Sequence, residues 1–275
     1  MIFARSCLLL TFAVTGLHAQ SKDFEEVSVQ GMVFIRIPAG TFTMGTTAPV
    51  QAALEAAKMW TRFENVELPA HEVTLSRPFL IGKYEVTQKE WKTFARAPKK
   101  TVFSFNGDDL PAESVSFEDV TSFITGMNKK AGKQLFRLPT EAEWEYCARS
   151  GSAEAYGNGK DGVQITGKTL GDYAWFAATA GGKPHPVGKK LPNAWGLHDM
   201  MGNVWEWCRD WYLPTFYTAG AATNPLNKDA DNSSERVIRG GSWFVAAGNL
   251  RAAFRGASLP DARSAHIGFR LVCEP

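Results

Sequence analysis

The chain has 275 residues, of which 44% are hydrophobic, and a formal net charge of +2. This length is sufficient for one large domain or two small ones with a substantial hydrophobic core. The charges nearly balance and no basic run stands out, so nucleic-acid binding has no electrostatic support. We therefore expect a globular protein that does not bind nucleic acid.

Residues 1–19 have the pattern of a secretory signal peptide. Arg5 supplies a positive start, Leu8–Val14 is a short apolar core, and a small-residue cleavage site ends at Ala19. A membrane anchor is the alternative, but the apolar stretch is too short to span a bilayer. We predict one domain over residues 20–275, a periplasmic or secreted location and no membrane span.

Export places the cysteines in an oxidising compartment. Cleavage of the signal leaves Cys147, Cys208 and Cys273. Three cysteines predict one disulfide and one free thiol, and their number leaves the pairing open. They lack the paired spacing of a zinc site.

The first half of the mature chain contains strand patterns. MVFIRIPAGTFTMG, residues 32–45, predicts two short strands that are interrupted at Pro38–Gly40. HEVTLSRPFLIGKYEVT, residues 71–87, alternates apolar and polar residues and also predicts strand structure.

Three capping-box pairs predict the starts of short helices, because a Ser or Thr and an acid three residues later cap each other's backbone amides. The pairs are Thr87 with Glu90, Ser116 with Asp119, and Thr140 with Glu143. After the second pair, apolar residues recur at helical spacing from Val120 to Met127. From about Gly151 onward the sequence predicts no long helix.

The aromatic content is high, with nine Trp and eighteen Phe. In a fold with little regular structure, large rings fill the space that helices and sheets would otherwise close. We therefore assign Trp91, Trp144 and Trp207 to the core. The predicted class is α+β, as a single compact domain that is rich in loops.

Six motifs in order then resemble a known family. They are IPAGTFTMG, KYEVTQKEW, RLPTEAEWEYCARSG, NAWGLHDMMGNVWEWCRDWY, RGGSW and GFRLV. Together they resemble the formylglycine-generating enzymes, or sulfatase-modifying factors, over about Gly31 to Val272. The resemblance implies a variant of the C-type lectin fold.

The resemblance also implies where a redox centre would lie. The name-giving members oxidise a substrate cysteine to formylglycine with copper held by two cysteines just after the GGS frame. In this sequence those positions are Val245 and Leu250. Copper(I) needs soft thiolate ligands, and Cys208 alone cannot replace the pair. We therefore expect no copper and no formylglycine oxidase activity, and we assign no catalytic residue.

A structural calcium site is a further implication of the resemblance. By position its ligands are the side chains of Asp199 and Glu206 and the backbone carbonyls of Gly202 and Val204. Calcium takes hard oxygen ligands, which suits this set. A capped turn with surface acids is the alternative, and the resemblance favours calcium.

The resemblance places Glu85, Trp205 and Ser242 in the groove that receives substrate peptide. The alternative for Ser242 is a turn, and for Trp205 it is the core. Arg251 and Arg255 have two alternatives as well. In the first, both side chains are fixed positive charges that bind an acidic ligand. In the second, they form ion pairs that hold the fold.

Family members carry a disulfide between the helix that begins after Thr140 and the C-terminal strand. The resemblance therefore implies a bridge between Cys147 and Cys273, although the family positions lie one or two residues away. Cys208 would then be a buried free thiol.

Three functional hypotheses remain. The first is a peptide- or protein-binding accessory factor in the periplasm, for example for a secretion or envelope complex. The second is a maturation enzyme with different chemistry, since the resemblance includes a periplasmic member implicated in maturation of the siderophore pyoverdine. The third is a structural role in an envelope complex. The sequence does not name the partner.

Overall fold

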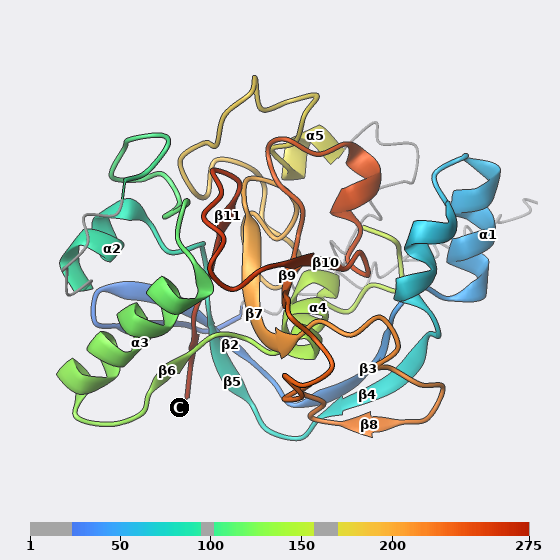
Figure 1. The fold of residues 1–275 in the computed structure, drawn as a ribbon, viewed down its shortest axis with the longest axis horizontal. Coiled ribbons are helices and arrows are strands. Elements are labelled where there is room, and N and C mark those ends of the chain that lie inside the picture. The colour runs from blue at the N-terminus through green and yellow to red at the C-terminus, as the bar shows by residue number, and fades with distance from the viewer. Residues whose placement is uncertain (1–23, 95–101, 157–169, 275) are drawn as a thin grey trace, which may run out of the picture.

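The computed structural model describes residues 24–94, 102–156 and 170–274 (Figure 1). The predicted signal peptide, residues 1–19, lies outside these ranges. The helical elements are α1 (Ala48–Ala56), η1 (Arg62–Glu67), α2 (Gln88–Phe94), α3 (Phe117–Ala131), α4 (Glu141–Arg149), α5 (Leu170–Tyr173) and η2 (Ala247–Leu250), where η marks a 3-10 helix. The strands are β1 (Glu26–Val29), β2 (Met32–Ile37), β3 (Gly40–Met44), β4 (His71–Leu75), β5 (Phe79–Gly82), β6 (Phe136–Arg137), β7 (Trp205–Trp211), β8 (Ala222–Thr223), β9 (Arg236–Arg239), β10 (Gly256–Ser258), β11 (Ile267–Gly268) and β12 (Val272–Cys273).

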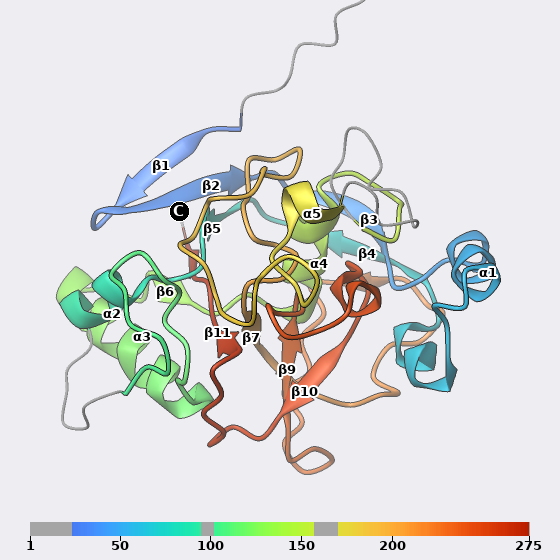
Figure 2. The same cartoon turned by 90° about the horizontal axis from the view of Figure 1, so that it is seen from above.

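The described strands form three small sheets. The five-stranded sheet has the order β1-β2-β5-β12-β6, so the last strand of the chain is inserted between β5 and β6. The four-stranded sheet has the order β10-β9-β7-β11, and the three-stranded sheet has the order β3-β4-β8. β1 lies at an outer edge (Figure 2). The two ends of the described chain are therefore joined through one sheet.

The predicted strands are confirmed. Residues 32–45 form β2 and β3, which are interrupted at Pro38–Ala39. Residues 71–87 contain β4 and β5, separated by a turn at Ser76–Pro78. In β4 the side chains of His71, Val73 and Leu75 are buried and those between them are more exposed, as period-two patterning requires.

All three predicted capping boxes are present. The amide of Glu90 donates to the Thr87 hydroxyl at 3.2 Å, and the Thr87 amide donates to the Glu90 carboxylate at 2.8 Å. α3 and α4 begin in the same way at Ser116 and Thr140. Because these caps are local in sequence, the helix starts could be predicted without knowledge of the fold.

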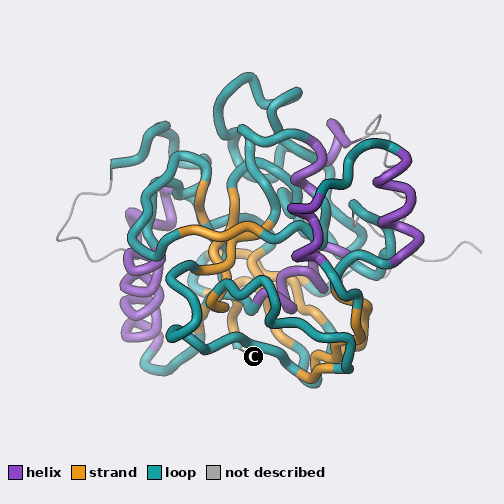
Figure 3. The backbone as a smooth tube through the Cα atoms, turned by 45° about the vertical axis from the view of Figure 1, so that its right-hand side comes forward, coloured by secondary structure: helices purple, strands orange, loops and turns teal. Residues whose placement is uncertain are grey.

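Helix α1 was not predicted. Its N-cap, Thr47, makes no side-chain cap hydrogen bond, and Leu54 is its buried residue. In the part of the chain after Gly151 that the structure describes, α5 and η2 have four residues each, which agrees with the prediction of no long helix there. Figure 3 shows that loops and turns make up much of the described chain. Within the described residues, no helix has the length and apolar character needed to cross a membrane.

Two hydrophobic clusters fill the interior on opposite sides of the five-stranded sheet. The first, called the α3 cluster, includes Phe34, Trp91, Phe123, Trp207, Phe269 and Cys273. The second, called the α4 cluster, includes Ile35, Trp144, Cys147, Cys208 and Val272. Trp91 stacks on Phe123 with ring centroids 4.9 Å apart. The assignment of Trp91, Trp144 and Trp207 to the core is therefore confirmed.

The disulfide predicted between Cys147 and Cys273 is wrong for this structure. All three cysteines in the described ranges are buried free thiols. Neighbouring residues of a strand point to opposite faces of a sheet. Val272 therefore faces the α4 cluster with Cys147, whereas Cys273 faces the α3 cluster. A shift of one residue along β12 is sufficient to place the two sulfurs on opposite sides of the sheet.

Buried ion pairs lie within or between segments of the described chain. Each joins an arginine to a glutamate, and the side chains are at most 6% exposed. The closest N–O distances are Arg251–Glu67 2.6 Å, Arg255–Glu141 2.7 Å, Arg239–Glu145 2.5 Å, Arg149–Glu145 2.8 Å and Arg270–Glu206 2.7 Å. Arg251 and Arg255 thus belong to ion pairs that hold the fold, one of the two predicted alternatives.

Replacing Glu145 with glutamine tests this network. The change leaves the buried Arg239 and Arg149 without their shared carboxylate. We expect the free energy of unfolding to fall by about 3–5 kcal/mol, the usual cost of removing one partner of a buried pair. Urea denaturation measures the loss. Glu118→Gln, an exposed change on α3, is the control and should stay within about 0.5 kcal/mol of the parent. Equal midpoints for both variants would contradict the assignment.

Candidate functional site

The loop that precedes β7 is fixed by its backbone. Asp199, Gly202 and Asn203 all have positive φ, at 56°, 82° and 55°. The Gly202 amide donates to the Gly240 carbonyl at 2.9 Å, and a Cβ at Gly202 would overlap the carbonyl oxygen of Trp175. Only glycine fits there, because the backbones approach too closely for a side chain. The loop therefore holds Asp199 and the start of β7 in fixed positions.

Glu206, one of the predicted calcium ligands, is saturated by protein donors. Nε of Arg270 lies 2.9 and 2.7 Å from its two carboxylate oxygens, and Nη2 lies 2.7 Å from Oε1. The Trp144 indole donates to Oε2 at 2.7 Å. Three N–H groups, one of them shared between the two oxygens, thus occupy both oxygens of the carboxylate. The structure therefore assigns Glu206 to an ion pair with Arg270.

Asp199, the other predicted carboxylate ligand, has an unused oxygen. Its Oδ2 accepts a hydrogen bond from the Gly188 amide at 2.7 Å. Its Oδ1 is buried and has no hydrogen-bond partner. Burial raises the pKa of Asp199 to about 6, against the lowering effects of the Gly188 amide and of Arg270. A buried carboxylate oxygen without a donor is the kind of atom that a cation would satisfy.

Glu85 adds a third carboxyl to this region. It is 1% exposed and accepts hydrogen bonds from the Asn203 side chain at 2.8 Å and the Val204 amide at 3.2 Å. Burial first, and then the charges of Asp199 and Glu206, raise the pKa of Glu85 well above its usual value. Like charges in a low-dielectric interior disfavour one another's ionised form.

The residues fit calcium in part. Asp199 offers a free anionic oxygen and the local charge is negative, whereas Glu206 is occupied by Arg270. Among the described residues, no three His, Cys, Asp or Glu side chains are placed to hold a metal. A calcium ion would therefore depend on Asp199 together with backbone carbonyls, which calcium accepts as ligands.

The three predicted cleft residues are buried. Glu85, Trp205 and Ser242 are 1%, 8% and 0% exposed. The Ser242 hydroxyl accepts a hydrogen bond from the Phe244 amide at 3.3 Å, which is the turn alternative, and the Trp205 ring packs on Phe254 at 6.0 Å. The contacts that the structure shows are structural, and a role in holding substrate stays a prediction.

The side chains of Val245 and Leu250 meet at Gly241, in the RGGSW motif. A Cβ at Gly241 would overlap Leu250 Cδ2 and lie 3.2 Å from Val245 Cγ2. Both side chains thus pack on the same glycine, and Leu250 is fully buried. The place where the resemblance puts two cysteines is therefore closed by two aliphatic side chains.

Two residues that organise the site were not assigned by sequence reasoning. Arg270 neutralises Glu206, and the Asn203 side chain connects Glu85 to the backbone of His185. Arg270 lies in the terminal GFRLV motif, and Asn203 lies in the GNVWEW segment. The signal for Arg270 was a charged residue within the apolar motif GFRLV, but its partner is 64 residues away.

Comparison with known proteins agrees with the fold. Residues 19–275 match the family described as "Sulfatase-modifying factor enzyme 1-like domain". The chain is 35% identical over 186 residues to the formylglycine-generating enzyme of Streptomyces coelicolor, covering 58% of this chain and 51% of that protein. It is 29% identical over 310 residues to the formylglycine-generating enzyme of Thermomonospora curvata, covering 90% and 94%. The first match spans about half of the relative's length.

A solved structure extends the comparison to three dimensions. The structure of PvdO from Pseudomonas aeruginosa has a TM-score of 0.72 and 28% sequence identity, covering 89% of this chain and 95% of that chain. The predicted α+β class and the single compact domain with a C-type-lectin-like fold are confirmed.

Thermal unfolding with calcium and with chelator tests the predicted metal site. We expect calcium to raise the melting temperature through Asp199, since a ligand at a hundred times its Kd adds about 2.7 kcal/mol, or several degrees for a domain of this size. Asp199→Ala should abolish the shift. Asp231→Ala, at an exposed acidic residue in the loop between β8 and β9, should preserve it. Identical midpoints in calcium and chelator would remove the site.

Proposed function

The chain belongs to the sulfatase-modifying factor enzyme 1-like family, and we propose that it is an exported accessory factor that binds a peptide or partner protein, for example in a secretion or envelope complex. The observation that carries the proposal is the packing of Val245 and Leu250 on Gly241. The RGGSW motif is present, but Val245 and Leu250 stand where formylglycine formation requires two thiols.

Thiol chemistry at other positions has little support. Cys147 and Cys208 are fully buried, and burial raises the pKa of each thiol well above its usual value. Burial also raises the pKa of Cys273. The thiolate is the form that binds soft metals and attacks disulfides, so these three cysteines are poor copper ligands and poor nucleophiles at neutral pH.

An exposed aromatic group on the same frame supports binding. Phe244 directly follows the RGGSW motif and is 65% exposed, although the preceding Trp243 is buried. Its ring stacks on His266 with centroids 5.7 Å apart and an interplanar angle of 12°, and it meets Trp243 edge-on at 5.5 Å. A large apolar side chain that is exposed and supported by two neighbouring rings is a typical anchor for a protein partner.

A second candidate function is maturation of a siderophore by chemistry that does not use cysteine. The observation that favours it is the similarity to PvdO, which extends over most of both chains. The buried Glu85 and Asp199, with their raised pKa values, are the acid–base groups that such chemistry would have available.

The oxidase test has a clear expected result. Incubation of the purified protein with copper, oxygen and a cysteine peptide should give no aldehyde product by mass spectrometry, because Val245 and Leu250 bind no metal. The double change Val245→Cys with Leu250→Cys should introduce copper(I) binding, since both side chains already meet at Gly241. Turnover by the unmodified protein would overturn the proposal.

Site-specific photocrosslinking tests partner binding. A benzophenone side chain at position 244, expressed in the periplasm, should give a discrete crosslinked product. The control is position 129, where Lys129 is exposed near the C-terminal end of α3. Mass spectrometry identifies the captured protein or peptide. The same products at both positions, or none at 244, would reject a partner surface at the frame.

A further inference from the structure

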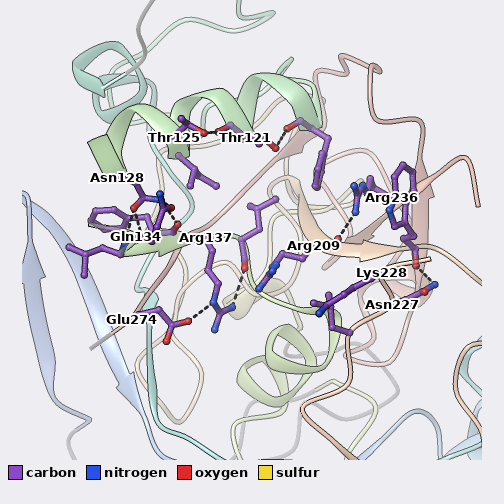
Figure 4. Close-up of a pocket in the computed structure, with 17 residues that line it drawn as sticks. Thr121, Thr125, Asn128, Gln134, Arg137, Arg209, Asn227, Lys228, Arg236 and Glu274 are labelled. Carbon is purple, nitrogen blue, oxygen red and sulfur yellow. Dashed lines mark hydrogen bonds and ion pairs between the residues drawn. The ribbon is translucent and has the colours of Figure 1, made fainter. Parts of the chain in front are cut away.

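A pocket of about 700 Å³ lies outside the site described above. Its walls come from α3, β6, the end of β7 and the start of β9, with Glu274 at one side (Figure 4). None of the predicted calcium or cleft residues lines it. It is thus a separate cavity.

Four basic side chains and one acidic side chain, that of Glu274, line the pocket. Arg209 and Lys228 line it and are exposed, and neither takes part in the ion pairs of the described residues. Arg137 also lines it, but its charge is used by Glu143 at 2.6 Å and Glu274 at 2.5 Å. Figure 4 shows these side chains distributed along the cavity. The surplus charge favours an anion.

Arg236 is a third cation of the pocket and is held in place by aromatic rings. Its guanidinium lies 3.6 Å from the Trp211 ring centroid and 4.2 Å from that of Phe117. Nη1 donates to the Arg209 carbonyl at 2.6 Å, and Nε is buried without an acceptor. Burial lowers the pKa of Arg236 to about 10, although the charge of nearby Asp210 raises it. A fixed, partly dehydrated guanidinium without a carboxylate partner is pre-organised for an anionic group.

The edge of the sheet in this pocket is closed to an added strand. β6 is an edge strand of the five-stranded sheet. The Asn128 side chain of α3 accepts the Phe136 amide at 2.7 Å and donates to the Phe136 carbonyl at 2.9 Å. These are the groups through which an extended peptide would join the sheet. Recognition in the pocket must therefore use side chains.

Apolar side chains form another part of the pocket wall. Ile124 and Leu226 line the pocket together with the rings of Phe117 and Trp211. We propose that this pocket binds a small organic anion, in which a carboxylate or phosphate meets Arg209, Lys228 and Arg236 and an apolar body packs against α3. This size and mixture of surfaces is typical of ligand pockets.

Calorimetric titration with three matched probes tests the proposal. The probes are 2-naphthoate, 2-naphthyl phosphate and the neutral 2-naphthalenemethanol. We expect at least one anion to bind, the alcohol to bind more weakly by roughly tenfold or more, and added salt to weaken the anion. The comparison of the two anions distinguishes a carboxylate ligand from a phosphate ligand.

Substitutions locate the binding. The double variant Arg209→Gln with Lys228→Gln should lower the anion affinity by roughly tenfold or more, since it removes two charge-assisted contacts. Lys92→Gln, on α2 and outside the pocket, is the control and should bind like the parent. Equal affinities for the alcohol and the anions, an unchanged double variant, or no binding of either anion would overturn the proposal.

Discussion

Buried arginine–glutamate pairs hold this fold together, because the described residues after α4 lie mostly in loops and very short strands. Arg239 and Arg255 connect the β9 region and the following loop to α4, and Arg270 connects the final strands to β7. Each guanidinium is also hydrogen-bonded to backbone carbonyls, such as those of Ala252 and Ala253 for Arg239. Loops without a regular ladder need such partners for their buried carbonyls. The planar, permanently charged arginine side chain suits that task better than lysine would.

The same pairing shapes the candidate site. The Glu206–Arg270 pair fixes the start of β7, and the 199–206 loop is held between Trp175 and Gly240. Around this one guanidinium lie two further carboxyls, Glu85 and Asp199, whose pKa values are raised. The interior therefore carries negative charge that a cation or a shared proton would relieve. The two proposals made above, a calcium site and acid–base chemistry, both rest on this charge.

At the RGGSW motif the glycine backbone is present, but the two positions that carry thiols in the oxidases carry aliphatic side chains. Gly241 has a positive φ of 76° and is closely packed. The side chains that pack on it are those of Val245 and Leu250. Aliphatic packing keeps the loop in place, and Phe244 remains exposed beside it. The basic pocket under α3 depends on other elements altogether. The frame and the pocket are thus built from different elements, so one surface can change without altering the other.

Local signals in the sequence determined the capped starts of α2, α3 and α4 and the division of β2 from β3, because those features need only neighbouring residues. The ordered motifs determined the family and the C-type-lectin-like class. Features that depend on distant residues came only from the tertiary structure. The face on which Cys273 lies, which excludes its bridge to Cys147, follows from the register of β12 between β5 and β6. The pairing of Glu206 with Arg270 joins residues 64 positions apart, and the charged pocket gathers Arg209, Lys228 and Arg236 from separate segments. Sequence spacing carries no record of such contacts, because packing in three dimensions decides which side chains meet.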